Sequence, residues 1–464
     1  MKLLDGPKTL PLVQMYNWIV DPLSYMETNA QRYGDVIKAQ FVNFPPFILI
    51  ANPQMVQEVF SNDNKLFDCG KGNGILKPIL GEHSLIMQDG DRHQRQKRLL
   101  IPPFHGDRMK AYGQLICQTA TDAITQNMNG EAFSVRSTMQ EISLRVILEA
   151  VFGLSENSEN PEQKLRYRNL KQLLSLVLEG LSAPWRVSFL FLPILQKDLG
   201  NWSPWGQFLD RSRQIDKLIY AEIESRRHEP ASISQDRTDI LSLLMAARDE
   251  AGEPMSDAEL RDDLMTLLVA GHETTASALA WAFYWVHSQP QVFDRLIEEL
   301  DGVGADPDPN IVYQLPYLTA VCNETLRIYP VGMLTFPRVV RSTIKMMDYE
   351  FEQGTYLAPC IYLLHHREDL YPNPKTFRPE RFLERQFTPY EFIPFGGGSR
   401  RCLGMVFALF EMKLVLATVL TQFKLTFADR SPVKPARRGV TLAPSSNLRM
   451  VVQGIRQPRS LSCK

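Results

Sequence analysis

The sequence has almost no net charge, no cysteine pair at metal-binding spacing and no apolar run long enough to cross a membrane. Its 51 Lys and Arg balance 52 Asp and Glu, which gives no electrostatic reason to expect nucleic acid as a partner. The six cysteines are scattered without a C-x-x-C pair, which argues against a disulfide scaffold or a zinc site. MKLLDGPKTLPL lacks the unbroken apolar core of a signal peptide. We therefore expect a cytoplasmic protein without a transmembrane anchor.

Helical periodicity dominates what is present. VIKAQFVNFPPFILIA predicts a short hairpin with FILI as its buried strand, and apolar residues recur at helical spacing from Pro53 onward. Further strand signals lie at residues 338–361 and near the C-terminus. Polar breaks at HEPASISQDRTD and DGVGADPDPN are typical of surface loops between long helices. These patterns predict a mainly α protein with small β-sheets. The 464 residues would by length alone suggest several domains, but we expect a single domain, 1–464.

One cysteine follows a glycine-rich loop and precedes an apolar helix, in FIPFGGGSRRCLGMVFALFEMKLVLATVL from Phe392. Cys402 could be a small buried hydrophobe, a nucleophile or a metal ligand. The helix N-terminus and the flexible glycines favour charge on the sulfur, because both bring free backbone N–H groups to it. A single thiolate suits a metal whose other positions are already filled, as in haem.

This loop resembles the haem-binding signature of the cytochromes P450. The fixed positions are Phe395, Gly398, Arg400, Cys402 and Gly404, and all are present. The resemblance implies the cytochrome P450 fold and haem b, with Cys402 as the axial ligand of the iron. It also implies that the Phe395 ring shields the sulfur and that Arg400 faces a haem propionate.

A long helix is predicted by MSDAELRDDLMTLLVAGHETTASALAWAFYWVHSQP. Ser256 and Glu259 form a capping box, and no proline interrupts the segment before about Gln289. Apolar residues cover most of its circumference, so we expect it to be central and buried. The polar AGHETT segment in its middle is compatible with a kink in which threonines bond back to carbonyls one turn earlier.

The same segment resembles the oxygen-binding part of that family. The resemblance implies that Gly271 lets dioxygen approach the backbone. It also implies that Thr274 and Glu273 are catalytic and relay protons. His272 occupies the variable position of the pattern and is interpreted as a neighbour.

A third segment, LPYLTAVCNETLRIYPVGMLTFPR, places Glu324 and Arg327 on one helix face. In isolation this pair indicates a solvated helix face. With PKTFRPERFLE it resembles the E-x-x-R and P-E-R-F elements of the family. The resemblance implies a structural ion network of Glu324, Arg327 and Arg381. Arg338 matches a position that contacts a propionate.

The segment DGDRHQRQKRLLIPPF resembles the helix that holds the other propionate, but with a lysine in place of the usual arginine. The pattern assigns His93 and Lys97 to the cofactor, and Arg98 could substitute for the lysine. A basic surface facing an electron donor is the alternative for Lys97 and Arg98.

The resemblance implies a haem-thiolate monooxygenase that uses O2, and it is nearest to cyanobacterial members of fatty-acid hydroxylase type. We expect hydroxylation of a long-chain fatty acid, with a sesquiterpene or other terpenoid as the alternative substrate. The expected pocket walls are residues 67–78, the surroundings of Ala270, residues 331–336 and residues 443–447, and most are apolar. LSAPWRVSFLFLPIL is a candidate lid, and its Arg186 is a candidate partner for a carboxylate.

Rival classes are a haem-thiolate isomerase, dehydratase or peroxygenase and a non-enzymatic haem sensor. The isomerase, dehydratase and peroxygenase need no acid–alcohol pair such as Glu273 and Thr274, so its presence favours dioxygen activation. Turnover of reductant with a substrate would distinguish an enzyme from the sensor. No flavin or iron–sulfur segment follows the cysteine loop, so we expect electrons from a separate ferredoxin and its reductase. Arg400, Arg401 and Lys413 are candidates for the docking face, and the chain is expected to be a monomer.

Overall fold

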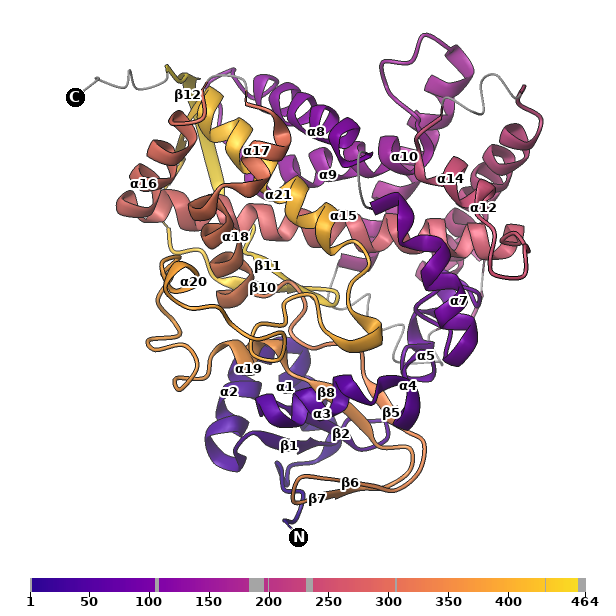
Figure 1. Cartoon of the computed structure of the whole chain (residues 1–464), viewed down its shortest axis with the longest axis vertical. Coiled ribbons are helices and arrows are strands. Elements are labelled where there is room, and N and C mark those ends of the chain that lie inside the picture. Colours follow the sequence, from indigo (N-terminus) through magenta and orange to yellow (C-terminus); the bar gives the residue numbers. More distant parts are fainter. Residues whose placement is uncertain are drawn as a thin grey trace.

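The computed structural model describes residues 2–104, 108–182, 196–198, 200–230, 237–304, 307–429 and 431–457. It is 57% helix with small sheets, which confirms the fold class expected from the sequence. Most long helices occupy one part of the molecule, and a sheet with short helices occupies the part that holds the N-terminus (Figure 1).

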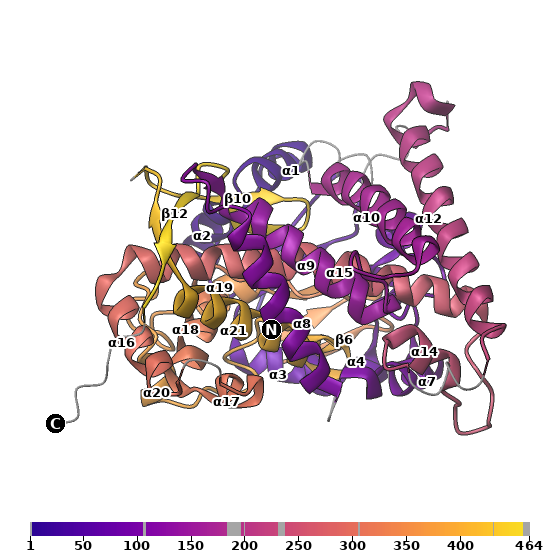
Figure 2. The same cartoon turned by 90° about the horizontal axis from the view of Figure 1, so that it is seen from above.

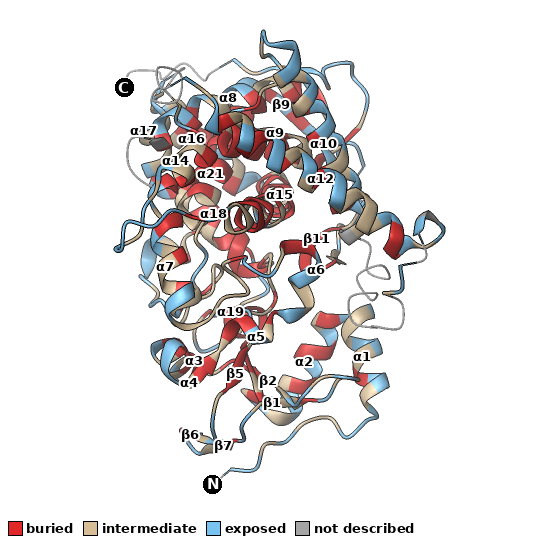
Figure 3. Ribbon diagram, turned by 90° about the vertical axis from the view of Figure 1, so that its right-hand side faces the viewer, coloured by how far each residue is buried: buried red, intermediate tan, exposed pale blue. Residues whose placement is uncertain are grey.

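The central element is α15 (Asp257–Ser288), the longest helix described. Its capping box is present: the Ser256 hydroxyl accepts from the N–H of Glu259, whose carboxylate accepts from the N–H of Ser256. The helix packs against α9 (Val135–Phe152), α18 (Pro316–Ile328) and α21 (Met405–Gln422). Its side chains are therefore mostly buried, as Figure 3 shows. The predicted central helix is confirmed.

Further helices enclose this centre, and several begin with proline in the first turn, where no backbone N–H is needed. Seen from above in Figure 2, α8 and α9 cross the region of α15 and α21. Within the described residues, α21 alone is long and apolar enough to cross a membrane, and 67% of that stretch is buried in the fold. The surrounding helices are α7 (Gly90–Leu100), α8 (Arg108–Thr125), α10 (Pro161–Ser182), α12 (Pro204–Arg227), α14 (Ile240–Ala246), α16 (Pro290–Asp301), α17 (Pro309–Gln314) and α20 (Arg381–Glu384).

The largest sheet has the strand order β1-β2-β8-β5-β3. The predicted hairpin is confirmed, because β1 (Val36–Ala39) and β2 (Phe47–Ile50) pair antiparallel. The other strands of this sheet are β3 (Phe67–Asp68), β5 (Arg338–Val340) and β8 (Tyr356–Pro359). The nearby short helices are α1 (Pro11–Val20), α2 (Pro22–Tyr33), α3 (Pro53–Ser61), α4 (Asp63–Leu66), α5 (Cys69–Gly72), α6 (Lys77–Leu80) and α19 (Ile361–His365).

Three smaller sheets complete the described β structure, and all are antiparallel. They confirm the strand signals at residues 338–361 and near the C-terminus. Their strands are β4 (Phe133–Ser134), β6 (Ile344–Met346), β7 (Tyr349–Phe351), β9 (Phe423–Phe427), β10 (Pro435–Arg438), β11 (Thr441–Pro444) and β12 (Arg449–Ile455).

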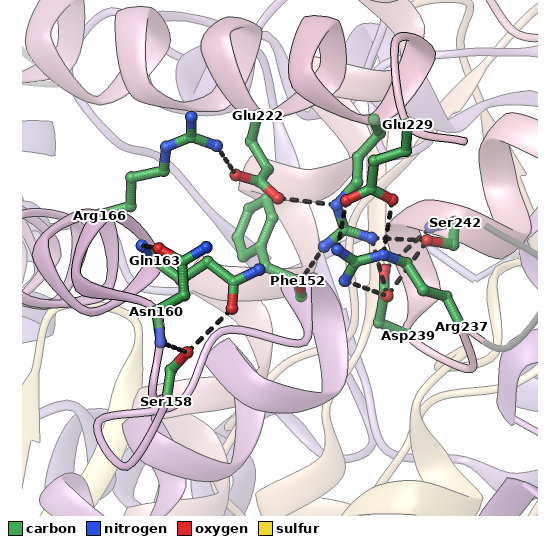
Figure 4. A network of polar contacts seen from close by, with 11 residues as sticks. Phe152, Ser158, Asn160, Gln163, Arg166, Glu222, Glu229, Arg237, Asp239 and Ser242 are labelled. Atoms are coloured by element: carbon green, nitrogen blue, oxygen red, sulfur yellow. Dashed lines mark hydrogen bonds and ion pairs between the residues drawn. The ribbon is translucent and has the colours of Figure 1, made fainter. Parts of the chain in front are cut away.

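A polar network ties the C-terminal end of α12 to its neighbours (Figure 4). Glu222 pairs with Arg166 of α10 and with Arg226 of its own helix, each at 2.8 Å. Asp239, which caps α14, pairs with Arg226 at 2.9 Å and with Arg237 at 3.8 Å. Each buried charge therefore has an opposite partner, and three helices are fixed to one another at this point.

A second ion network is buried rather than solvated. Glu324 and Arg327 have fully buried side chains, and their Oε2 and Nε atoms lie 2.6 Å apart. Arg381 of α20 approaches the other Glu324 oxygen at 3.0 Å, and the N–H of Arg378 donates to it at 2.8 Å. The solvated helix face expected from the pair in isolation is wrong, and the network implied by the resemblance is present. Partners that lie far away in the sequence bury it.

Replacing Glu324 with Ala is expected to lower the free energy of unfolding by about 3–5 kcal/mol, because it leaves two buried arginines without their anion. Glu384→Ala is the matched control. Its carboxylate pairs with Arg378 at an exposed position, which is worth at most about 1 kcal/mol. Denaturant unfolding of the three proteins checks this, and equal unfolding midpoints would contradict the structural role of Glu324.

Candidate functional site

The cysteine loop has a backbone shape that its glycines make accessible. Gly396 and Gly398 both have φ of +66°, in the left-handed region that other residues avoid. The Cys402 N–H donates to the Phe395 carbonyl at 3.0 Å, which closes the turn before α21 begins. Phe395 itself packs against the main core. Among the described cysteines Cys402 is the only exposed one, so the loop does not enclose this residue in the core.

A buried ion pair braces this loop from the side of the sheet. Arg338 donates to both carboxylate oxygens of Asp63, at 2.9 and 3.1 Å, and to the Gly397 carbonyl at 3.1 Å. Asp63 also accepts from the N–H of Ser399 at 2.9 Å. The remaining Arg338 donors go to groups on residues 335–336. Protein groups within the described residues already accept hydrogen bonds from all five N–H groups of Arg338. These groups therefore compete with the predicted contact between Arg338 and a haem propionate.

The basic helix α7 reaches the same loop through the lysine. The Lys97 Nζ donates to the Ser399 carbonyl at 2.6 Å. Arg98 instead pairs with Glu250 at an exposed position, with 55% of its own side chain exposed. The structure therefore places Lys97, and not Arg98, in contact with the cysteine loop.

Two buried polar atoms near the loop have no protein partner among the described residues. They are Nδ1 of His93 and Nε of Arg400. Burial and the nearby charges of Arg400 and Lys97 lower the pKa of His93 to about 3, so the imidazole is neutral at neutral pH. Burial and Arg400 also lower the pKa of Lys97. Arg400 is paired with Asp89, whereas Lys97 has no carboxylate within ion-pair distance among the described residues. The three side chains therefore form a donor-rich cluster with net positive charge, and a group carrying carboxylates would satisfy its free donors.

The middle of α15 is more exposed than the turns on either side of it. Ala270 is exposed although most of the helix is buried, so accessible space reaches this point. The Thr274 Oγ1 donates to the Ala270 carbonyl at 2.5 Å, which is the back-bonding expected from the sequence. Gly271 has a packing role, because a Cβ there would lie 3.1 Å from the Cδ1 of Ile147 in α9.

Glu273 is held on the side of α9. Its two carboxylate oxygens accept from Arg136 at 2.6 Å and from Gln140 at 2.7 Å. The structure therefore places Glu273 and Thr274 on one helix turn, with their recorded hydrogen bonds going to different partners. His272 is buried beside them, and burial together with Arg136 lowers its pKa to about 4, which keeps it neutral. It is a neighbour, as interpreted from the sequence.

Comparison with known proteins identifies the family. The family model described as Cytochrome P450 matches residues 4–450, nearly the whole chain.

The chain belongs to the cytochrome P450 family. It is 33% identical over 463 residues to cytochrome P450 135B1 of Mycobacterium tuberculosis, covering 100% of this chain and 94% of that protein. It is 31% identical to cytochrome P450 138 of the same species, covering 97% and 95%. The solved structure of retinoic acid-bound cyanobacterial CYP120A1 superposes with a TM-score of 0.83 at 23% identity, covering 98% of this chain and 99% of that one. The cytochrome P450DA heme domain gives 0.84 at 22% identity, covering 98% of both.

Family membership settles the cofactor and the reaction class. Cytochromes P450 bind haem b through a cysteine thiolate and are monooxygenases. The residues at the candidate site fit that group: the loop exposes a thiol, and the cationic cluster of His93, Lys97 and Arg400 suits haem carboxylates. A Cβ at Gly404 would meet no protein atom within 4 Å, so the protein also leaves room beside the cysteine.

The Cys402 thiol is subject to opposing influences. Desolvation by the surrounding protein raises its pKa, whereas the backbone N–H of Gly404 and the charge of Arg401 lower it. Desolvation is the larger effect, so the helix terminus and the cation alone do not ionise the thiol as the sequence suggested. A bound metal ion supplies the remaining stabilisation of a thiolate.

The three residues that the sequence suggested for docking an electron donor differ in their exposure. Lys413 is buried, and its Nζ donates to the Tyr313 carbonyl at 2.6 Å and to the Thr319 hydroxyl at 2.8 Å. Arg400 has only 6% of its side chain exposed. Both are therefore excluded from a docking surface, and Arg401 alone of the three is exposed.

One buried acid was missed by sequence reasoning. Glu411 of α21 is fully enclosed, and burial raises its pKa to about 8, opposed by a hydrogen bond from Ser143 of α9. The Ser143 hydroxyl also contacts the Gly271 carbonyl at 3.3 Å, so Glu411 is linked to the middle of α15. A lone acid inside the apolar run FALFEMKLVL was the available signal, because such a residue must be neutral or paired when buried.

Glu411 makes stability depend on pH in a defined direction. Its pKa of about 8 lies above the ordinary carboxyl value of 4.5, so the folded protein keeps a proton that the unfolded chain releases. The associated stability is present at low pH and is lost as pH rises towards about 8. Between about pH 6 and about pH 9 the melting temperature of the wild type should fall relative to that of Glu411→Gln. Glu298→Gln, at an exposed position, should show no such trend. Parallel melting curves for all three would contradict the buried acid.

Proposed function

We propose that this cytochrome P450 hydroxylates a long-chain fatty acid or a similar aliphatic lipid, with Cys402 as the haem ligand. The observation that carries the haem-ligand assignment is the exposed Cys402 at the end of the glycine loop. Beside it, Nδ1 of His93 and Nε of Arg400 have no protein partner among the described residues. The haem, when bound, supplies dioxygen activation and transfer of one oxygen atom, with electrons from a donor protein. The chain supplies binding, orientation and proton delivery.

The side chains around the loop divide these tasks. His93, Lys97 and Arg400 would hold the haem carboxylates and so orient the cofactor. Thr274 presents a hydroxyl beside the exposed Ala270; after leaving its carbonyl partner, this hydroxyl would donate a hydrogen bond and a proton to the dioxygen substrate. Glu273 would take up a proton from solvent and pass it towards that hydroxyl; its carboxylate is held on the side of α9 by Arg136 and Gln140.

An aliphatic substrate is supported by the walls that the sequence assigned to the pocket. Residues 331–336 are mostly apolar, and Phe336 is 40% exposed. CYP120A1, which shares the fold, binds retinoic acid, a long apolar molecule with a terminal carboxylate. The candidate carboxylate partner Arg186 and most of the candidate lid lie outside the described residues.

The electron donor is a separate protein, as is usual for the family. We infer that it is a ferredoxin with its reductase and that it docks near the exposed Arg401. We also infer that residues 1–464 form one domain, because the largest apolar core contains side chains from Leu99 to Val452.

Replacing Cys402 with Ser is expected to abolish the strongly red-shifted absorption of the reduced, CO-bound protein, because that band depends on a thiolate ligand. Cys117→Ser, which changes a partly buried cysteine on α8, should keep it. Absorption spectra of the reduced proteins with and without CO check the assignment. A red-shifted band in Cys402→Ser would overturn it.

Hexadecanoate is expected to shift the haem absorption towards the high-spin form on binding, and to yield a hydroxylated acid when a ferredoxin, its reductase and NADPH are present. Its methyl ester and hexadecane serve as controls that keep the chain and remove the charge. A sesquiterpene hydrocarbon should be bound and converted less well. Turnover of the sesquiterpene without turnover of hexadecanoate would replace the fatty-acid proposal with the terpenoid one.

A further inference from the structure

Asp89 lies where two parts of the site meet, and it is not among the residues that the family resemblance marks. It occupies the N-cap position of α7, yet its side chain makes no capping bond to that helix. A side-chain capping bond stabilises a helix, so the carboxylate gives up local stabilisation and contacts other partners instead. Those partners lie in two segments distant from each other in the sequence.

One set of partners is the turn that opens the expected substrate wall. Asp89 accepts from the N–H groups of Cys69 at 2.8 Å, Gly70 at 2.9 Å and Lys71 at 3.2 Å. A Cβ on Gly70 would lie 2.1 Å from the Met87 carbonyl oxygen, so this turn sits directly against the segment that carries Asp89. In Figure 1, α5 accordingly lies beside the start of α7.

The other partner is the arginine of the cysteine loop. The Arg400 Nη2 lies 2.6 Å from the Asp89 Oδ1 and donates to the Gln88 carbonyl at the same distance. Oδ1 also accepts from Cys69 and Gly70, so one oxygen atom joins the substrate wall to the arginine. The Nε of Arg400 is buried without a protein partner among the described residues, which leaves it for the cofactor.

We propose that Asp89 is a positioning residue that couples the backbone at residues 69–71 to Arg400, two positions before the haem-binding cysteine. The proposal rests on the function proposed above. A substrate that displaces the wall moves the Asp89 carboxylate, and the Arg400 charge moves with it relative to the haem carboxylates. Because coupling is reciprocal, a change at Arg400 also alters the wall.

The test measures the amide hydrogen exchange of residues 69–71 in the haem-loaded full chain. Arg400→Gln is expected to speed this exchange about tenfold, the effect of weakening a charge-assisted network. Asp89→Asn should speed it at least as much. In the double variant, Arg400→Gln should add nothing to Asp89→Asn, because the connecting carboxylate is already gone.

Matched controls are the adjacent residues of the same charge. Asp91 and Arg401 are both exposed, so Asp91→Asn and Arg401→Gln should leave the exchange of residues 69–71 unchanged. Unchanged exchange of α16 in every variant shows that the fold persists. If Arg400→Gln loses haem, Arg400→Lys, which keeps the charge without the planar fork, takes its place. The coupling would be overturned if the two single-variant effects on the exchange rate of residues 69–71 multiplied in the double variant. It would also be overturned if Arg400→Gln left that rate unchanged.

A second readout runs in the opposite direction. Asp89→Asn should raise the midpoint potential of the haem iron, because the Arg400 charge is no longer offset, whereas Asp91→Asn should leave the potential unchanged. Equal potentials in these two variants would overturn the proposal. A wrong haem ligand would appear separately, in the CO spectrum of Cys402→Ser, and does not affect the exchange measurement.

Discussion

The hydrogen bond from the Cys402 N–H to the Phe395 carbonyl closes the turn on which the whole site depends. A free cysteine is usually buried among apolar neighbours, as Cys322 and Cys360 are here. At Cys402 the chain reaches its helix through two left-handed glycines, and the residue stays exposed. The side chains that surround the loop stabilise this backbone conformation.

Charge balance shapes the protein around this turn. Arg338 is neutralised by Asp63 and Arg400 by Asp89, so each carboxylate brings a different segment of the chain to the loop. Among the described residues Lys97 has no carboxylate partner and adds a positive charge, and the neutral His93 adds an unpartnered ring nitrogen. The protein thus pairs the arginines that brace the loop and reserves the remaining donors for an anionic group. Buried charges that must all be satisfied leave few alternative arrangements of these segments.

Much of the fold was predictable because its signals are local. The capping box at Ser256 and the hairpin of β1 and β2 involve residues close in the sequence, and both formed as expected. Burial of charged side chains was not predictable in the same way. Glu324 and Arg327 have the spacing of an ion pair on a helix surface. Lys413 is a cation, which suggested an exposed docking residue. Their environment comes from α20, from residues 313–319 and from other parts of the chain that no local pattern reveals.

The amino-acid sequence by itself determined which residue types stand at the cysteine loop and along the central helix, and that was enough to indicate the family and its cofactor. Only the tertiary structure decided how those residues are partnered: Arg338 with Asp63, Glu273 with Arg136, and Arg400 with Asp89. The physical reason is that a side chain's charge state and free donors depend on burial and on groups hundreds of positions away. Spacing along the chain fixes periodicity and caps, but it does not specify which distant carboxylate a buried arginine meets.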